Sequence, residues 1–270
     1  MEQGIDAIRI NPGNIGNEAR IKTVVEYATK YNVPIRVGVN SGSIDSSLIT
    51  NQKDERVRAE LLVESARKHV NILENLGFKN IVVSLKGSNV IETIHAYRLA
   101  SKIFPYPLHL GITEAGPSEI GIIRSVAGLA PLLVDRIGDT IRISLSDEPE
   151  EEIKVAKRLL HDIGLYPNYP TLISCPTCGR TQVDVVTLAN KVLKYLEDNN
   201  IQKTVAIMGC IVNGPGEASH ADIGLAGGAD CWVLFKHGRM LRKINAEDAY
   251  DTLVDEINKM RMPKTTKDKL

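Results

Sequence analysis

The sequence predicts an α/β protein in which a parallel sheet with crossover helices is followed by a smaller α+β domain. From Ala7 to Asp162, short runs rich in β-branched residues alternate with longer segments whose apolar residues recur at helical spacing, as in successive βα units. After Gly164, residues 165–170 read Leu-Tyr-Pro-Asn-Tyr-Pro, which is typical of a linker. A second domain is therefore expected to begin near Thr171.

Five βα units are expected in the first domain. The expected strands are Ala7–Asn11, Ile35–Asn40, Ile81–Lys86, Leu108–Thr113 and Ile141–Ser144, and the expected helices include Glu18–Lys30, Arg56–Leu76, one from near Asn89, and Pro149–Asp162. Gly77 follows the second helix and Gly164 follows the last, and glycine suits the left-handed conformation that ends many helices. Asp147 is the expected N-cap of the last helix, because Pro149 and three acidic residues follow it.

The second domain is expected to be a small α+β unit. Its expected elements are a strand Thr171–Ser174, a helix from about Val183 to Glu197, a strand Val205–Met208 and a hairpin through Lys236–Arg239. The domain limits that follow are 1–166 for the first domain, 167–262 for the second and 263–270 for a disordered tail rich in Lys and Thr.

Composition excludes several classes of protein. The chain has 33 basic and 33 acidic side chains, so its formal charge is zero and nothing favours a nucleic-acid or anionic-membrane partner. Hydrophobic residues make up 43% of the chain, which excludes wholesale disorder. No apolar run approaches the ~20 residues of a membrane span, and the N-terminus does not resemble a signal peptide. A cytoplasmic protein is expected.

One face of the predicted sheet is polar along its whole width. Alternate residues of the strands place Arg9, Arg36, Lys86 and Arg142 on the same face. A strand buried on both faces is nearly all apolar, and clustered cations repel one another unless an anion lies among them. The pattern predicts an anionic-ligand site, and the alternative is an open sheet with one solvated face.

Three cysteines and one glutamate are predicted to converge on a metal centre. Cys175 and Cys178 follow one expected strand, and Cys210 follows another. The sharp turn of residues 212–217 can bring Glu217 beside Cys210. Three soft thiolates suit zinc or an iron-sulfur cluster, but no second Cys-x-x-Cys or matching His is present to complete a structural zinc site.

Two further candidate ligands are assigned to other roles. Cys231 lies among apolar neighbours with no turn to expose it, which indicates a buried free cysteine. His220 lies in a Ser-His-Ala-Asp stretch, which is typical of a surface loop.

Four motifs closely resemble the 4-hydroxy-3-methylbut-2-enyl diphosphate synthase family. They are RINPGNIG at 9–16, ITEAG at 112–116, ISCPTCGR at 173–180 and VNGPGE at 212–217. The resemblance implies a partial TIM-type barrel, made of its last five βα units, followed by a small α+β domain that holds a 4Fe-4S cluster. It also implies reductive ring-opening and dehydration of 2-C-methyl-D-erythritol 2,4-cyclodiphosphate to (E)-4-hydroxy-3-methylbut-2-enyl diphosphate, on the methylerythritol phosphate route to isoprenoids.

The resemblance also implies roles for particular residues. The implied cluster ligands are Cys175, Cys178, Cys210 and Glu217, the same four that spacing indicates. The implied substrate-binding residues are Arg9, Arg36, Asn40, Lys86, Arg142 and Ser144. Glu114 matches a barrel glutamate thought to act in acid-base chemistry. Glu217 is the unusual ligand, since a carboxylate on iron is more labile than a thiolate and can give way to a substrate oxygen.

The family further implies partners and an assembly. The electron donor is expected to be reduced ferredoxin or flavodoxin, which leave no short motif to distinguish them. A homodimer is expected, with Glu114 facing Glu217 of the partner subunit. The chain begins where the family's fourth barrel strand begins, so a fragment with little activity of its own is expected. Two alternatives are a phosphate-binding barrel lyase or isomerase with structural zinc, and a non-catalytic remnant that binds a partner chain.

Overall fold

The computed structural model describes residues 1–10, 18–40, 54–212 and 214–261. The chain divides into two compact units, residues 1–166 and 167–270. Residues 11–16 of the first motif, Asn213 of the last motif and the expected tail at 263–270 lie outside the described residues. No helix of the described ranges is long and apolar enough to cross a membrane.

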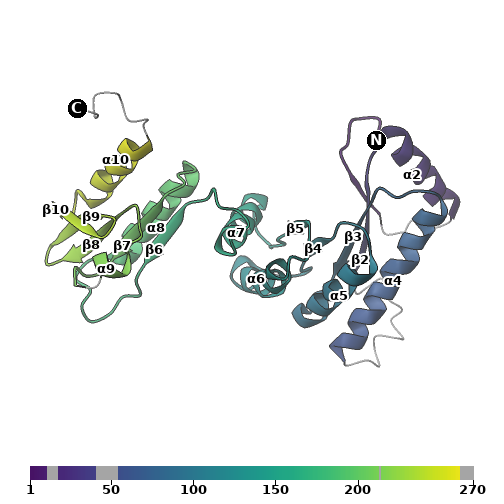
Figure 1. Cartoon of the computed structure of the whole chain (residues 1–270), viewed down its shortest axis with the longest axis horizontal. Coiled ribbons are helices and arrows are strands. Elements are labelled where there is room, and N and C mark those ends of the chain that lie inside the picture. Colours follow the sequence, from purple (N-terminus) through teal and green to yellow (C-terminus); the bar gives the residue numbers. More distant parts are fainter. Residues whose placement is uncertain (11–17, 41–53, 213, 262–270) are drawn as a thin grey trace. The chain divides into compact units, whose positions relative to one another are not determined.

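The first unit alternates strands and helices, as expected (Figure 1). Its strands are β1 (Ile8–Ile10), β2 (Ile35–Asn40), β3 (Ile81–Lys86), β4 (His109–Gly111) and β5 (Thr140–Arg142). Its helices are α2 (Glu18–Tyr31), α4 (Glu55–Asn75), α5 (Val90–Ile103), α6 (Ser118–Val134) and α7 (Pro149–Asp162). The fourth and fifth strands are shorter than predicted, because pairing ends before Ile112 in the fourth and before Ile143 in the fifth.

The strands run parallel and lie side by side in chain order. β1, β2 and β3 form one sheet, in which Arg9 is level with Arg36 and Asn40 with Lys86. β4 and β5 form a second sheet, in which Gly111 is level with Arg142. Because the strands are parallel, their carboxyl ends lie at one edge, where ligands of α/β proteins usually bind.

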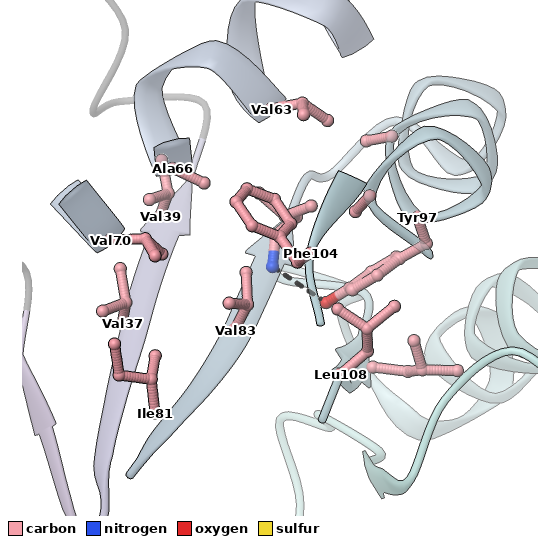
Figure 2. Close-up of a cluster of buried hydrophobic side chains, with 14 of the residues drawn as sticks. Val37, Val39, Val63, Ala66, Val70, Ile81, Val83, Tyr97, Phe104 and Leu108 are labelled. Atoms are coloured by element: carbon pink, nitrogen blue, oxygen red, sulfur yellow. Dashed lines mark hydrogen bonds between the residues drawn. The ribbon is translucent and has the colours of Figure 1, made fainter. Parts of the chain in front are cut away.

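Side-chain caps begin two helices of the first unit, α4 and α5, and their apolar residues pack on the sheet. Asp54 accepts a hydrogen bond from the backbone N of Arg56 at 2.8 Å, and Asn89 accepts one from Glu92 N at 2.9 Å. The core shown in Figure 2 includes Val63, Ala66 and Val70 of α4, Val37 and Val39 of β2, and Ile81 and Val83 of β3, all buried.

The predicted N-cap of α7 is wrong by one residue. Glu148 occupies the N-cap position and makes no side-chain cap bond. The Asp147 carboxylate instead accepts hydrogen bonds from Glu148 N and from the Ser118 hydroxyl. With Pro149 fixing the first turn, Asp147 is free to connect the start of α7 to the start of α6.

A side chain takes part in the pairing of β3 with β4. One isolated bridge joins Val83 and Leu108. Two residues further along β3, Leu85 N donates to the Tyr97 hydroxyl at 3.0 Å, and that hydroxyl donates to His109 O at 2.7 Å (Figure 2). In a continuous parallel ladder Leu85 N would bond to His109 O directly. The hydroxyl of Tyr97 therefore acts as an inserted rung, and the sheet divides at this point.

The second unit is a five-stranded mixed sheet with two longer helices. Its elements are β6 (Thr171–Ser174), α8 (Val185–Asp198), β7 (Thr204–Met208), α9 (Gly214–Glu217), β8 (Ile223–Gly228), β9 (Cys231–Lys236), β10 (Arg239–Asn245) and α10 (Ala249–Arg261). The strand order is β10-β9-β8-β7-β6, with β6, β7 and β8 parallel. The predicted hairpin is confirmed, since Lys236 pairs with Arg239 across a turn in which His237 and Gly238 have positive φ.

Candidate functional site

The cations predicted to share one sheet face line one cavity. It has a volume of ≈ 140 Å³ and lies at the carboxyl ends of the strands of the first unit. All six sequence-predicted substrate residues line it, and they are Arg9, Arg36, Asn40, Lys86, Arg142 and Ser144. The structure therefore brings this set together. A site rich in cations and hydrogen-bond donors suits a multiply charged anion such as a diphosphate.

Two positions without a side chain make room for these cations. A Cβ atom at Gly38 would lie 2.4 Å from Arg9 Nε, so the guanidinium of Arg9 occupies the space above the glycine. A Cβ atom at Gly111 would lie 3.0 Å from Lys86 Cε and 3.1 Å from the carbonyl oxygen of Arg142. Arg9 Nη2 also donates to Gly38 O at 3.4 Å. The positions of two cations thus depend on glycine at these points.

The cations perturb one another because little negative charge lies among them. Burial, followed by the charges of Arg36, Arg142 and Arg9, lowers the pKa of Lys86 to about 8. Burial and the charges of Arg9 and Arg142 also lower the pKa of Arg36. Among the described carboxylates, Glu152 forms the one ion pair with this group, with its Oε2 3.8 Å from Arg142 Nε. The cavity therefore favours an anionic ligand.

His109 of β4 was not among the residues predicted to form the site, although it lies beside one of them. Its Nε2 lies 3.2 Å from Lys86 Nζ, and its Nδ1 lies 2.8 Å from Thr140 Oγ1. Burial, then the charges of Lys86, Arg36 and Arg142, lowers the pKa of His109 to about 3, so the ring is neutral at physiological pH. The period-two alternation that identified the arginines also contains this residue, but a contact with Lys86 could not be derived from it.

Ser84 and Thr113 also line the cavity and were missed as site residues. Both follow the same alternation, so the signal that would have found them was present in the strands.

Glu114 lies just after β4, at the same edge as the cavity. It is exposed, and its φ of 54° lies in the left-handed region, which is uncommon for a residue other than glycine. The loop around it is held by Thr113 N, which donates to Gly87 O at 3.1 Å, and by Arg124 Nη1, which donates to Ala115 O at 3.0 Å. Unusual backbone conformations of this kind are concentrated at functional sites.

The three cysteines among the predicted cluster ligands lie on loops that follow neighbouring parallel strands of the second unit. Cys175 follows β6 and Cys210 follows β7, and Cys175 Sγ accepts a hydrogen bond from Gly209 N at 3.1 Å. All are free cysteines. Hydrogen bonds from Arg180 lower the pKa of the exposed Cys178 thiol, which favours the thiolate that binds metals.

The four ligands do not converge in this structure. In the part of the chain that the structure describes, no group of three or more His, Cys, Asp or Glu is close enough to hold a metal ion. Glu217 is the last residue of the one-turn helix α9. Gly214, the first residue of this helix, donates a hydrogen bond from its backbone N to Cys210 O at 3.1 Å. The donor chemistry fits an iron-sulfur cluster, since three free thiols lie on loops and a carboxylate lies at the end of α9.

The two residues set aside by sequence reasoning have different outcomes. His220 is exposed in a turn, as predicted. The burial predicted for Cys231 is wrong, because a turn containing Asp230, with φ 54°, comes immediately before it and leaves it half-buried at the start of β9. The Gly-Gly-Ala-Asp stretch before Cys231 was the signal for that turn.

Comparison with family models covers most of the chain. Residues 1–157 match the model described as the GcpE TIM-barrel domain, and residues 171–259 match that of the GcpE protein C-terminal domain.

Curated relatives match almost the whole chain at about half identity. A protein of Clostridium acetobutylicum is 49% identical over 96% of this chain and 74% of its own length. One from Exiguobacterium sp. is 49% identical over 96% of this chain and 68% of its own length. One from Ruminiclostridium cellulolyticum is 50% identical over 96% of this chain and 73% of its own length. Each of the three is named 4-hydroxy-3-methylbut-2-en-1-yl diphosphate synthase (flavodoxin).

Proposed function

Since this chain belongs to the GcpE family of 4-hydroxy-3-methylbut-2-en-1-yl diphosphate synthases, we propose that it reduces 2-C-methyl-D-erythritol 2,4-cyclodiphosphate to (E)-4-hydroxy-3-methylbut-2-enyl diphosphate. The conversion takes up two electrons and two protons, opens the cyclodiphosphate ring at a carbon–oxygen bond and releases one water. The observation that carries the proposal beyond the family is the cavity lined by Arg9, Arg36, Lys86 and Arg142.

The first unit is proposed to act as the substrate-binding part of a TIM-type barrel. Its five βα units are arranged in chain order, as barrel strands are. The four cations bind the two phosphate groups by charge-assisted hydrogen bonds, and Asn40 and Ser144 add polar contacts. Anchoring the diphosphate in this way fixes the carbon skeleton at the carboxyl ends of the strands, where Glu114 also lies.

Glu114 is proposed to supply the proton with which a hydroxyl leaves as water. Its carboxyl group is exposed at the edge of the cavity-bearing sheet, so it can reach both solvent and a bound substrate. The loop bonds of Thr113 and Arg124 hold its backbone in the left-handed conformation, which fixes the direction in which the side chain leaves the loop.

The second unit is proposed to hold a 4Fe-4S cluster through Cys175, Cys178, Cys210 and Glu217. When bound, the cluster would supply electrons for the reduction and a Lewis-acid iron. The flanking backbone contributes Gly209 N, whose hydrogen bond to Cys175 Sγ stabilises negative charge on that sulfur.

Flavodoxin is the proposed electron donor, because the relatives carry it in their names. The sequence alone left ferredoxin and flavodoxin open. Exchange of the two reduced proteins in the same assay distinguishes them, and turnover with ferredoxin but none with flavodoxin would contradict this choice.

The structural-zinc lyase or isomerase is not favoured by the family, and one experiment decides between it and the reductase. Anaerobically reconstituted protein is assayed with the cyclodiphosphate and reduced flavodoxin, and its iron, sulfide and zinc are measured. We expect brown protein with about four iron and four sulfide per chain and formation of the open-chain diphosphate. Colourless zinc protein that does not consume the substrate would refute the proposal.

A homodimer with shared sites is also proposed, in which Glu114 acts with Glu217 of the partner subunit. Mixed dimers of a Glu114→Ala chain and a Cys175→Ser chain test it. If sites are built across subunits, one site carries both defects and the other carries neither, so roughly half the activity returns. Activity near zero would show that each site is built within one chain.

A further inference from the structure

We infer that His109 is a positioning residue for Lys86: as a neutral hydrogen-bond acceptor it fixes the direction of the lysine ammonium without cancelling its charge. The inference deepens the proposed function, on which it rests, by assigning a role to a side chain outside the set of phosphate-binding residues.

The hydrogen-bond pattern determines which ring nitrogen carries the proton. A lysine ammonium has donors only, so Lys86 Nζ donates and His109 Nε2, 3.2 Å away, accepts. The ring proton therefore lies on Nδ1, which donates to Thr140 Oγ1 at 2.8 Å. The Lys86 ammonium thus sets the tautomer, and the Thr140 hydroxyl on β5, which can accept as well as donate, accommodates it.

The surroundings of the ring keep it neutral. Burial and the nearby charges of Lys86, Arg36 and Arg142 lower the pKa of His109 to about 3. A carboxylate in this place would orient Lys86 equally well, but it would form an ion pair with the lysine and oppose an incoming phosphate. A neutral acceptor gives orientation and leaves the positive charge for the substrate.

Two backbone features hold the arrangement in place. His109 O accepts a hydrogen bond from the Tyr97 hydroxyl at 2.7 Å, so the histidine cannot shift along the sheet without breaking it. Two residues further along β4, the absent side chain of Gly111 leaves the space that the Lys86 side chain crosses, since a Cβ there would lie 3.1 Å from Nζ. The Lys86 side chain is thus confined between the Nε2 acceptor of His109 and the backbone of Gly111.

The contact is tested first without substrate, by following the Lys86 side chain in NMR titrations of the full chain with ¹³C-labelled lysine. Lys86→Met identifies the resonance. The groups that act on Lys86 are His109, Arg36, Arg142, Arg9 and Glu152, and of these the variants change His109 alone. A hydrogen bond to the charged form raises a pKa, so His109→Leu is expected to lower the pKa of Lys86, whereas His109→Glu is expected to raise it.

The consequence is tested by calorimetric binding of 2-C-methyl-D-erythritol 2,4-cyclodiphosphate, with inorganic pyrophosphate as a second probe. His109→Leu is expected to weaken cyclodiphosphate binding by about tenfold, the order of one charge-assisted hydrogen bond. His109→Gln can place an oxygen where Nε2 lies and is expected to restore binding to within about threefold, which a merely structural role of the ring would not produce.

The outcomes separate the inference from the function on which it rests. A folded His109→Leu variant with an unchanged Lys86 titration and unchanged affinity would overturn the inference while the function stands. A parent chain that binds neither probe would overturn the function, and the NMR titration would still decide whether His109 holds Lys86.

Discussion

Replacing Tyr97 by phenylalanine should destabilise the first unit far more than the loss of one hydroxyl usually does. Tyr97 is fully buried, and its hydroxyl serves two backbone groups, Leu85 N at 3.0 Å and His109 O at 2.7 Å. The Tyr97→Phe variant leaves both groups unpaired between β3 and β4. A buried unsatisfied group costs about 1–3 kcal/mol, so we expect the free energy of unfolding to fall by about 2–4 kcal/mol.

The assay is urea unfolding followed by two signals. Far-ultraviolet circular dichroism reports both units, whereas the single tryptophan, Trp232, lies in the second unit and reports that unit alone. We expect Tyr97→Phe to shift the first unit's transition to lower urea and to leave the Trp232 transition in place.

Tyr106→Phe is the matched control. Tyr106 lies in the same unit, and its hydroxyl donates to the exposed Glu74 carboxylate at 2.7 Å, where water can replace it. Its loss should cost less than about 1 kcal/mol. If Tyr97→Phe costs no more than Tyr106→Phe, the strands close up without the hydroxyl, and its role as a rung is refuted.

Three other predictions concern the two sites. Cys178→Ser should abolish the iron and sulfide content of anaerobically reconstituted protein, whereas Cys231→Ser should keep both; retention of the full content by Cys178→Ser would remove that ligand assignment. Because the pKa of Lys86 is about 8 and a bound anion raises it, binding of the cyclodiphosphate at pH 8 should take up protons. Binding enthalpies that do not vary with the ionisation enthalpy of the buffer would contradict that uptake. Gly38→Ala should displace Arg9 and weaken cyclodiphosphate binding by about tenfold with no change of charge, as measured by calorimetry, and equal affinity with an intact fold would count against the role of the glycine.

Lys86 should also make stability depend on pH. Its pKa is lowered from 10.5 to about 8 in the folded chain, so the unfolded chain binds more protons between these values. The free energy of unfolding should therefore rise as the pH increases from about 8 towards 10.5, as far as this group contributes, and the gain should be absent in Lys86→Met.

Local patterns predicted much of the first unit, because alternate residues of each strand face either the apolar core or the polar side of the sheet. The alternation of Ile35, Val37 and Val39 with polar neighbours is confirmed by their burial, and Arg36 on the opposite face lines the cavity. In the second unit the strands β6 and β7 were predicted, but β8 was missed. β8 has three glycines in six residues, which weakens any strand signal, although every residue of it is buried.

The features that escaped prediction depend on contacts between distant parts of the chain. The Tyr97 hydroxyl meets Leu85 and His109, each twelve residues away, and no local pattern distinguishes it from an ordinary buried tyrosine. The contact of Lys86 with His109 likewise spans 23 residues. The helix α10 is an exception, since it was missed although Leu253 and Ile257 show helical spacing.

The glycines beneath Arg9 and Lys86 bear on any redesign of the cavity for another phosphorylated compound. Exchanging the cations alters how much charge the site carries, but Gly38 and Gly111 determine where that charge sits. A methyl group at either position would displace the neighbouring cationic side chain and leave the number of charges in the cavity unchanged. A designer could therefore tune the spacing between the bound phosphates through two uncharged backbone positions, and a library that varied the ionisable residues alone would never sample that variable.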